Sequence, residues 1–200
     1  VSAYDMAIIA QAAFNNSDVL EISSTKSYKL APTQNNPSGA TCANEHRLII
    51  TEDETNELYC PEAKAGKTGY TSLAGNTLVT YGEKDGRRII SVVLKGQPSP
   101  NYFLDGKNLL QFGFQNFQNV SIPDNETKYI TGSDPVSING TDYQPDELEL
   151  EPGTVITLPK DASFQDASME LVTELPDNRP ERAAALLQYT YNDRKIGQAY

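Results

Sequence analysis

The sequence holds one histidine, His46, and two cysteines, Cys42 and Cys60, among 200 residues. A structural zinc site needs four ligands, so a histidine without companions argues against a metal centre, and we expect neither a metal nor another cofactor. The two cysteines enclose a short polar loop. They could form a disulfide in an exported protein or could be unrelated thiols, and their spacing leaves both readings open.

Long apolar runs and an excess of basic residues are also missing. No segment approaches the roughly 20 apolar residues that a helix needs to cross a bilayer, and the first residues lack the pattern of a signal peptide. We therefore expect any export signal or membrane anchor to lie outside this sequence. With 16 Lys+Arg against 27 Asp+Glu, the net charge is −11, which disfavours contact with nucleic acid and with anionic membranes.

The composition, 38% hydrophobic and 22% charged, is that of a chain that can bury a core. We expect two domains: an α+β domain over residues 1–117, with an antiparallel sheet and helices, and a small all-β, sandwich-like domain over residues 118–200. The second contains no histidine, no cysteine and no convergent catalytic set. We interpret it as a structural or spacer module.

The first domain begins with a helix signal, because Ser2 and Asp5 fit a capping box. The apolar positions that follow at helical spacing are Met6, Ile9, Ala10, Ala13 and Phe14. Residues 27–62 are rich in Pro, Asn, Thr and Gly, which predicts irregular connections with one short strand at 48–50.

Strands are predicted at residues 77–83 and 87–95, joined by a tight turn at Asp85-Gly86, and a helix at 105–117. Its sheet-covering residues are expected to be Leu109, Leu110, Phe114 and Phe117. In the second domain, short runs between turn residues predict six strands, at 128–131, 136–138, 155–158, 169–175, 186–191 and 195–200.

The triplet Lys67-Thr68-Gly69 stands at the start of strand-forming sequence. A strand there can present an ammonium, a hydroxyl and backbone N–H groups to an anionic substrate that carries a carbonyl, which is equipment for acyl transfer. The triplet alone is weak and also fits a solvated turn. A phosphate-binding loop is excluded because Pro61 occupies the position of its first glycine and a strand follows the threonine.

A matching nucleophile is missing. Ser23 and Lys26 formally fit Ser-x-x-Lys, but the nucleophile should open a helix, whereas extended or loop sequence through Pro32 follows here. The sequence therefore looks like part of an enzyme.

Several segments in one order resemble the D-alanyl-D-alanine carboxypeptidases, the low-molecular-mass penicillin-binding proteins. The segments are residues 2–7, 24–28, 66–71 with 74–75, 85–94 and 109–117, with a fainter likeness at Tyr189, Tyr191 and 195–197. This resemblance implies part of a penicillin-binding/β-lactamase-like sheet with helices. It also implies a serine peptidase of the cell envelope, whose partners are the peptidoglycan stem peptide and β-lactams.

The resemblance assigns roles to four residues. Lys67 would supply positive charge near the substrate carboxylate and the serine-lysine network, and Thr68 would donate a hydrogen bond to that carboxylate. Gly69 would let the substrate backbone pass close to the strand, and the N–H of Tyr70 would be one of two oxyanion-hole donors. Tyr102 stands where family members often carry an arginine that helps to hold the carboxylate, and it cannot give bidentate charge recognition.

In the family, the Ser-x-x-Lys and Ser-x-Asn elements precede the helix that matches residues 2–14. The resemblance therefore implies that the nucleophile lies before Val1, that the chain is inactive alone, and that it exposes apolar surface and self-associates. Two alternatives remain: a non-catalytic cell-wall or protein-binding module, and a β-lactamase. The β-lactamase ranks last because such enzymes usually end soon after the equivalent strands.

Overall fold

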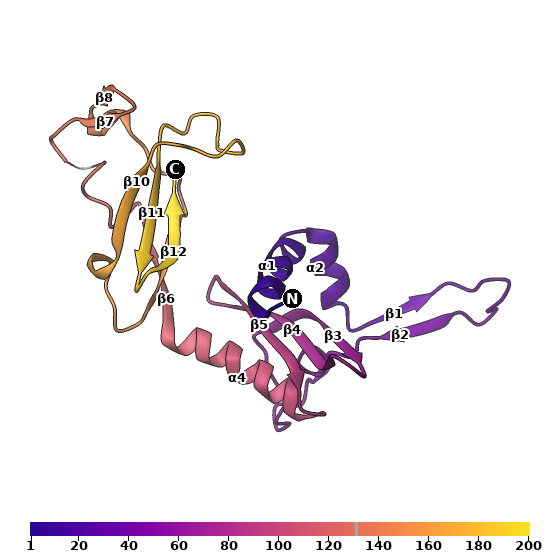
Figure 1. Cartoon of the computed structure of the whole chain (residues 1–200). Coiled ribbons are helices and arrows are strands. Elements are labelled where there is room, and N and C mark those ends of the chain that lie inside the picture. Colours follow the sequence, from indigo (N-terminus) through magenta and orange to yellow (C-terminus); the bar gives the residue numbers. More distant parts are fainter. Residues whose placement is uncertain (131) are drawn as a thin grey trace. The chain divides into compact units, whose positions relative to one another are not determined.

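The computed structural model describes residues 1–130 and 132–200 and divides the chain into two compact units, Val1–Gln115 and Asn116–Tyr200 (Figure 1). We call them unit 1 and unit 2. This division lies two residues from the boundary expected from the sequence. Among the described residues, the helices are all too short or too polar to cross a membrane.

Unit 1 is built on an antiparallel sheet of three strands in the order β3-β4-β5. The strands are β3 (Ala63–Thr71), β4 (Gly75–Lys84) and β5 (Arg87–Gly96), so the predicted strands are confirmed. Between β4 and β5, Asp85 and Gly86 have φ values of 50° and 72°. A tight hairpin turn of the predicted kind requires two such left-handed residues.

Helix α1 (Ala3–Phe14) covers one face of this sheet, where Ala10 and Phe14 pack against Ala65 and Tyr81. Its predicted capping box between Ser2 and Asp5 is confirmed. The predicted apolar face is only partly correct, because the side chain of Ile9 is 54% exposed.

Helix α4 (Asn101–Asn116) contributes Phe103, Leu110 and Phe114 to a core cluster with Leu78 of β4. A Cβ at Gly106 would lie 2.8 Å from Leu78, so a side chain at this position would keep the helix away from the sheet. The buried positions are thus 103, 106, 110 and 114. Two predictions are wrong here: Leu109 is 46% exposed, and Phe117 belongs to the next strand.

The segment predicted to be irregular is more ordered than its composition indicates. β1 (Ser27–Leu30) pairs with β2 (Ala40–Ala43) in a hairpin that projects from unit 1 (Figure 1), and α2 (Ser17–Ser24) precedes it. The strand predicted at 48–50 is wrong, because α3 (Arg47–Ile50) is a helical turn. A strand would point Leu48 and Ile49 to opposite faces, whereas both are buried.

Unit 2 contains a five-stranded antiparallel sheet in the order β10-β11-β12-β9-β6 and a separate hairpin, β7-β8, so its predicted all-β character is confirmed. The strands are β6 (Phe117–Ser121), β7 (Val136–Ile138), β8 (Thr141–Tyr143), β9 (Val155–Pro159), β10 (Ser168–Val172), β11 (Leu186–Tyr191) and β12 (Arg194–Ala199). Of the predicted strand at 128–131, residues 128–130 form a turn instead, and Thr131 lies outside the described residues. β6 and β8 were not predicted.

The core of unit 2 includes a buried polar pair. The hydroxyl of Tyr189 donates a 2.6 Å hydrogen bond to the carboxylate of Glu126, which also accepts the backbone N–H of Lys128. Glu126 is 5% exposed and Tyr189 is 1% exposed. Burial, together with this carboxylate, raises the pKa of Tyr189. These hydrogen bonds satisfy the buried carboxylate of Glu126 and connect the turn that precedes Glu126 to strand β11.

Self-association remains a prediction, and the helices of unit 1 show where it would occur. Tyr4, Ile8 and Ile9 of α1 and Ile22 of α2 are 74%, 49%, 54% and 74% exposed. Contact between two such surfaces would remove apolar area from water. We expect the double substitution Ile8→Lys/Ile9→Lys to lower the apparent mass in size-exclusion chromatography, whereas Leu109→Lys on α4 should not. A compact wild-type monomer at high concentration would contradict this expectation.

Candidate active site

β3 places the Lys67-Thr68-Gly69-Tyr70 segment along the edge of the three-stranded sheet. Antiparallel pairing with β4 sets the register, with Lys67 opposite Val79 and Tyr70 opposite Asn76. The predicted strand is therefore confirmed, and the segment is held by a ladder of backbone hydrogen bonds rather than lying in a loop. An edge strand has one row of backbone groups without a partner strand, which a ligand can use.

The ammonium of Lys67 donates a 2.7 Å hydrogen bond to the backbone carbonyl of Thr68. The carbonyl of the next residue, Gly69, accepts a hydrogen bond from the hydroxyl of Thr77 on the neighbouring strand β4, so this carbonyl points toward β4. Backbone groups of alternate residues in a strand point to the same side. The N–H of Tyr70 is therefore expected to point, like the carbonyl of Thr68, toward the outer edge of the sheet.

A cavity of about 610 Å³ opens beside this edge. Lys67 and Thr68 line it together with the C-terminal end of α2 and the base of the β1-β2 hairpin. Lys67 is exposed and Thr68 is half-buried. Gly69 and Tyr70 are not among the lining residues, and the side chain of Tyr70 is 71% exposed.

Glu45 is a cavity residue that sequence reasoning missed. The hydroxyl of Thr68 donates a long hydrogen bond of 3.4 Å to its carboxylate. Glu45 therefore occupies the position in which a substrate carboxylate was expected to meet Thr68. Because it is 23 residues before Thr68 in the sequence, no local spacing pattern connects the two.

Asn44 holds this part of the cavity together. Its amide nitrogen donates to the backbone carbonyls of Ser23 and Thr25, at 3.3 and 3.1 Å, and its amide oxygen accepts the N–H of His46. One side chain therefore joins the end of α2 to the start of α3. These contacts hold the backbone next to Glu45 and so bring Glu45 to the side of the cavity where Thr68 lies.

The formal Ser-x-x-Lys match does not have the geometry of a nucleophile and its base. Ser23 lies in the last turn of α2 rather than the first, and the ammonium of Lys26 forms an ion pair with Glu52. Both observations agree with the expectation from the sequence that Ser23 and Lys26 only formally fit Ser-x-x-Lys.

His46 lies beneath the strand at Gly66. Its Nε2 is 3.0 Å from the hydroxyl of Thr80, its ring meets the edge of Phe103, and its side chain is fully buried. A Cβ on Gly66 would lie 2.7 Å from the imidazole. Burial lowers the pKa of His46 to about 4, with a smaller contribution from Lys67. The ring is therefore neutral at physiological pH and supports the strand from below.

The two cysteines are free thiols, so the disulfide considered above is not formed in this structure. Cys42 is exposed on β2 and lines the cavity, whereas Cys60 is buried in the core cluster beneath the sheet. Burial raises the pKa of the Cys60 thiol. Cys60 is therefore expected to be unreactive while unit 1 is folded.

Tyr102 packs against Phe103, with ring centroids 4.1 Å apart. Burial raises the pKa of its hydroxyl, and the charge of Glu45 acts in the same direction while that of Arg47 opposes it. A guanidinium is thus present near the position where the family resemblance leads us to expect one, but it comes from α3. The guanidinium of Arg47 donates to Ser99, at 3.0 Å.

Solved structures share the fold of this chain. The D-alanyl-D-alanine carboxypeptidase DacD from Francisella tularensis is 19% identical with a TM-score of 0.55, and the match covers all of this chain and 59% of that one. Penicillin binding protein 6B from Escherichia coli is 20% identical with a TM-score of 0.51, and the match covers 98% of this chain and 48% of that one. The chain therefore has a penicillin-binding protein fold.

Residues 1–98 match the family model of the D-alanyl-D-alanine carboxypeptidases. The carboxypeptidase DacB2 of Mycobacterium tuberculosis is 30% identical over 116 residues, which cover 56% of this chain and 36% of that protein. These matches confirm the resemblance inferred from the ordered motifs. The chain spans about a third of the length of this curated relative.

Proposed function

We propose that this chain supplies the carboxylate-binding and oxyanion side of a serine D-Ala-D-Ala carboxypeptidase, which removes the terminal D-alanine from peptidoglycan stem peptides. The observation that supports the proposal best is the Lys-Thr-Gly triplet on an edge strand beside a cavity of about 610 Å³. The family match to residues 1–98 agrees with it. Such a substrate places the protein outside the cytoplasmic membrane.

The edge strand fits the chemistry of an acyl-enzyme. A stem peptide that lies along β3 ends in a carboxylate, which replaces Glu45 as the acceptor for the Thr68 hydroxyl and is attracted by Lys67. The N–H of Tyr70 then donates to the oxygen that becomes negative when a serine attacks the scissile carbonyl. β-Lactams carry the same carboxylate and carbonyl, and they acylate the same serine.

The nucleophile is proposed to come from polypeptide outside residues 1–200, because the serine-lysine match at 23–26 is committed to other contacts. The 200-residue chain alone is then inactive. The full-length product should be labelled by a fluorescent penicillin, and the chain alone should not. A full-length product without labelling and without carboxypeptidase activity would favour a non-catalytic cell-wall or protein-binding module.

Substitution of Lys67 tests its assigned role. In the full-length product, we expect Lys67→Gln to slow acylation by the fluorescent penicillin about 100-fold, the usual size of losing one electrostatic contact to the transition state. Lys64→Gln is the matched control, because Lys64 is exposed on the same strand and its ammonium binds the carbonyl of Pro61. Equal rates for the two variants would remove Lys67 from the mechanism.

A further inference from the structure

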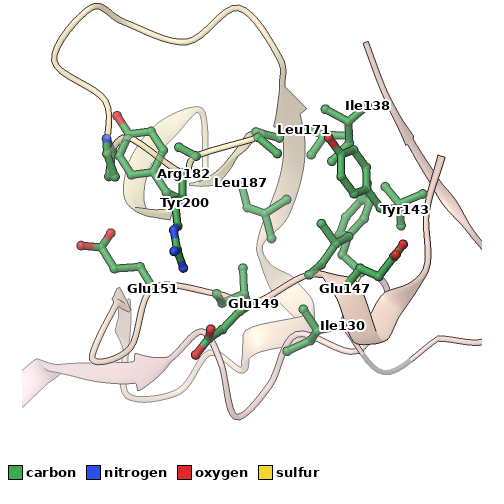
Figure 2. A pocket seen from close by; sticks show the side chains of 18 of the residues that line it. Ile130, Ile138, Tyr143, Glu147, Glu149, Glu151, Leu171, Arg182, Leu187 and Tyr200 are labelled. Carbon is green, nitrogen blue, oxygen red and sulfur yellow. The ribbon is translucent and has the colours of Figure 1, made fainter. Parts of the chain in front are cut away.

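Unit 2 contains a second cavity, which no step of the proposed reaction uses. Its volume is about 540 Å³, within the range of ligand-binding pockets. Leu187 at its base is buried and belongs to the core of unit 2, and Leu171 of β10 also lines it. Figure 2 shows Ile138 and Tyr143 of the β7-β8 hairpin on one side and Arg182 and Tyr200 on the other.

Three glutamates, Glu147, Glu149 and Glu151, line the mouth of this cavity and are exposed. Glu147 accepts the N–H of Gln144, whereas Glu149 and Glu151 form no side-chain hydrogen bond or ion pair with other described residues. Among the described residues that line the cavity, Arg182 is the single cationic one. The mouth of the cavity therefore carries uncompensated negative charge.

The chain at the mouth leaves a short 3₁₀ turn, Pro145–Glu147, with extended backbone at Leu148. Apolar and acidic residues alternate here, and Leu148 and Leu150 are half-buried between the exposed glutamates. This segment belongs to none of the described strands, and the backbone N–H groups of Glu149 and Leu150 have no backbone partner among the described residues. An extended peptide can pair with such a segment by adding a strand. Its alternate side chains would then face the leucines and the glutamates in turn.

The charge of the whole unit favours a basic occupant. Residues 116–200 hold 15 of the 27 acidic residues and 6 of the 16 basic ones, so unit 2 carries a charge of −9 out of −11. Positive ligands are therefore attracted to it over longer range, and negative ones are repelled.

We propose that this cavity binds an extended segment of a partner protein in which basic and apolar residues alternate. The apolar side chains enter the cavity lined by Leu171 and Leu187, and the basic side chains lie opposite Glu149 and Glu151. Unit 2 would then be a docking module, rather than the spacer that the sequence indicates.

A tryptophan-containing peptide gives a clean test, because the protein has no tryptophan. The probe is acetyl-Lys-Val-Lys-Trp-Lys-amide, titrated with the 200-residue chain at low salt. We expect a saturable blue shift of the tryptophan emission, because the indole enters an apolar cavity. The same residues in the order acetyl-Lys-Lys-Lys-Val-Trp-amide should bind much more weakly, and so should a peptide with glutamate in place of lysine.

Charge variants separate specific pairing from general attraction. Glu149→Gln/Glu151→Gln should weaken binding of the probe about tenfold, as expected for two exposed opposite-charge pairs. The matched control is Asp161→Asn/Glu170→Gln, which removes the same charge from exposed residues of unit 2 that do not line the cavity. It should change affinity less than twofold.

Ala184→Phe places a ring among the lining residues and should abolish the blue shift. Circular dichroism checks that this variant folds. If it does not fold, the charge variants alone decide whether the probe binds at this cavity. The proposal is overturned if the probe gives no saturable shift, if the reordered peptide binds equally well, or if both double variants weaken binding to the same extent.

Discussion

Gly66→Ala is expected to destabilise unit 1 by about 3 kcal/mol or more, at the upper end of the cost of overpacking a core. A Cβ at this position would lie 2.3 Å from the backbone carbonyl of Val79 and 2.7 Å from the ring of His46. Neither neighbour can yield easily, since the carbonyl belongs to the adjoining strand and the imidazole is packed against Phe103. The strand that carries Lys67 would have to shift.

Gly69→Ala on the same strand is the matched control. Its Cβ would meet only the hydroxyl of Thr77, at 2.6 Å, and that side chain can rotate away. A rotation gives up the hydrogen bond to the Gly69 carbonyl, so we expect a cost of about 1 kcal/mol. The comparison isolates close packing at Gly66 from the general effect of adding a methyl group to β3.

Cys60 is buried in the core of unit 1, so its thiol reacts with a labelling reagent only when unit 1 opens. The labelling rate therefore measures the opening of unit 1 without a contribution from unit 2. In a Cys42→Ser background, the labelling rate of Cys60 reports the free energy of opening. Gly66→Ala should raise this rate by two orders of magnitude or more, and Gly69→Ala by less than tenfold. Similar rates for both variants would show that the packing around Gly66 relaxes at little cost.

The strand of the candidate site was predictable because its signals are local. Lys67 and its neighbours precede a turn, a second strand and the Asp85-Gly86 turn, and each feature is readable within a few residues. The helices were less certain in detail. α4 uses Gly106 for close packing on Leu78, and no periodicity of apolar residues shows that a glycine will mark the buried face.

The partners of the strand were not predictable because long-range packing places them. Glu45 and His46 follow the β1-β2 hairpin, whose Pro- and Asn-rich composition indicates a loop, and Asn44 fixes both through contacts with α2. His46 was considered only as a metal ligand. Its burial under Gly66 follows from the fold and has no local signal.

Burial of His46 leads to a second large effect, on the pH dependence of stability. Its pKa is about 4 in the folded chain and about 6.5 in an unfolded chain. Above pH 6.5 the ring is neutral in both states, so proton binding by His46 makes no difference to stability there. As the pH falls toward 4, only the unfolded chain takes up the proton, so unfolding becomes easier by about 3 kcal/mol in total.

The single histidine makes this prediction directly measurable, since its imidazole proton resonances need no assignment. We expect the midpoint of its titration in the folded protein near pH 4. We also expect unit 1 to lose stability between pH 6.5 and 4, and the labelling rate of Cys60, compared at each pH between variants, measures this loss. His46→Gln keeps a side chain able to hydrogen-bond Thr80 but cannot take up a proton. Its stability should therefore fall by about 3 kcal/mol less than that of the wild type over this range.

Carboxylates also lose stabilising contacts in acid, but they do so equally in the wild type and in His46→Gln. The difference in stability between these two proteins therefore reports His46 alone. The pKa values of Asp5 and Glu52 are lowered by hydrogen bonds to Ser2 and Lys26, so their contributions disappear at low pH in both proteins. An ordinary titration midpoint near 6.5, with identical pH profiles for the wild type and His46→Gln, would show that water reaches the ring. Gly66 would then pack on a mobile side chain, and the strand carrying Lys67 would lack the rigid support that the proposed carboxylate-binding edge requires.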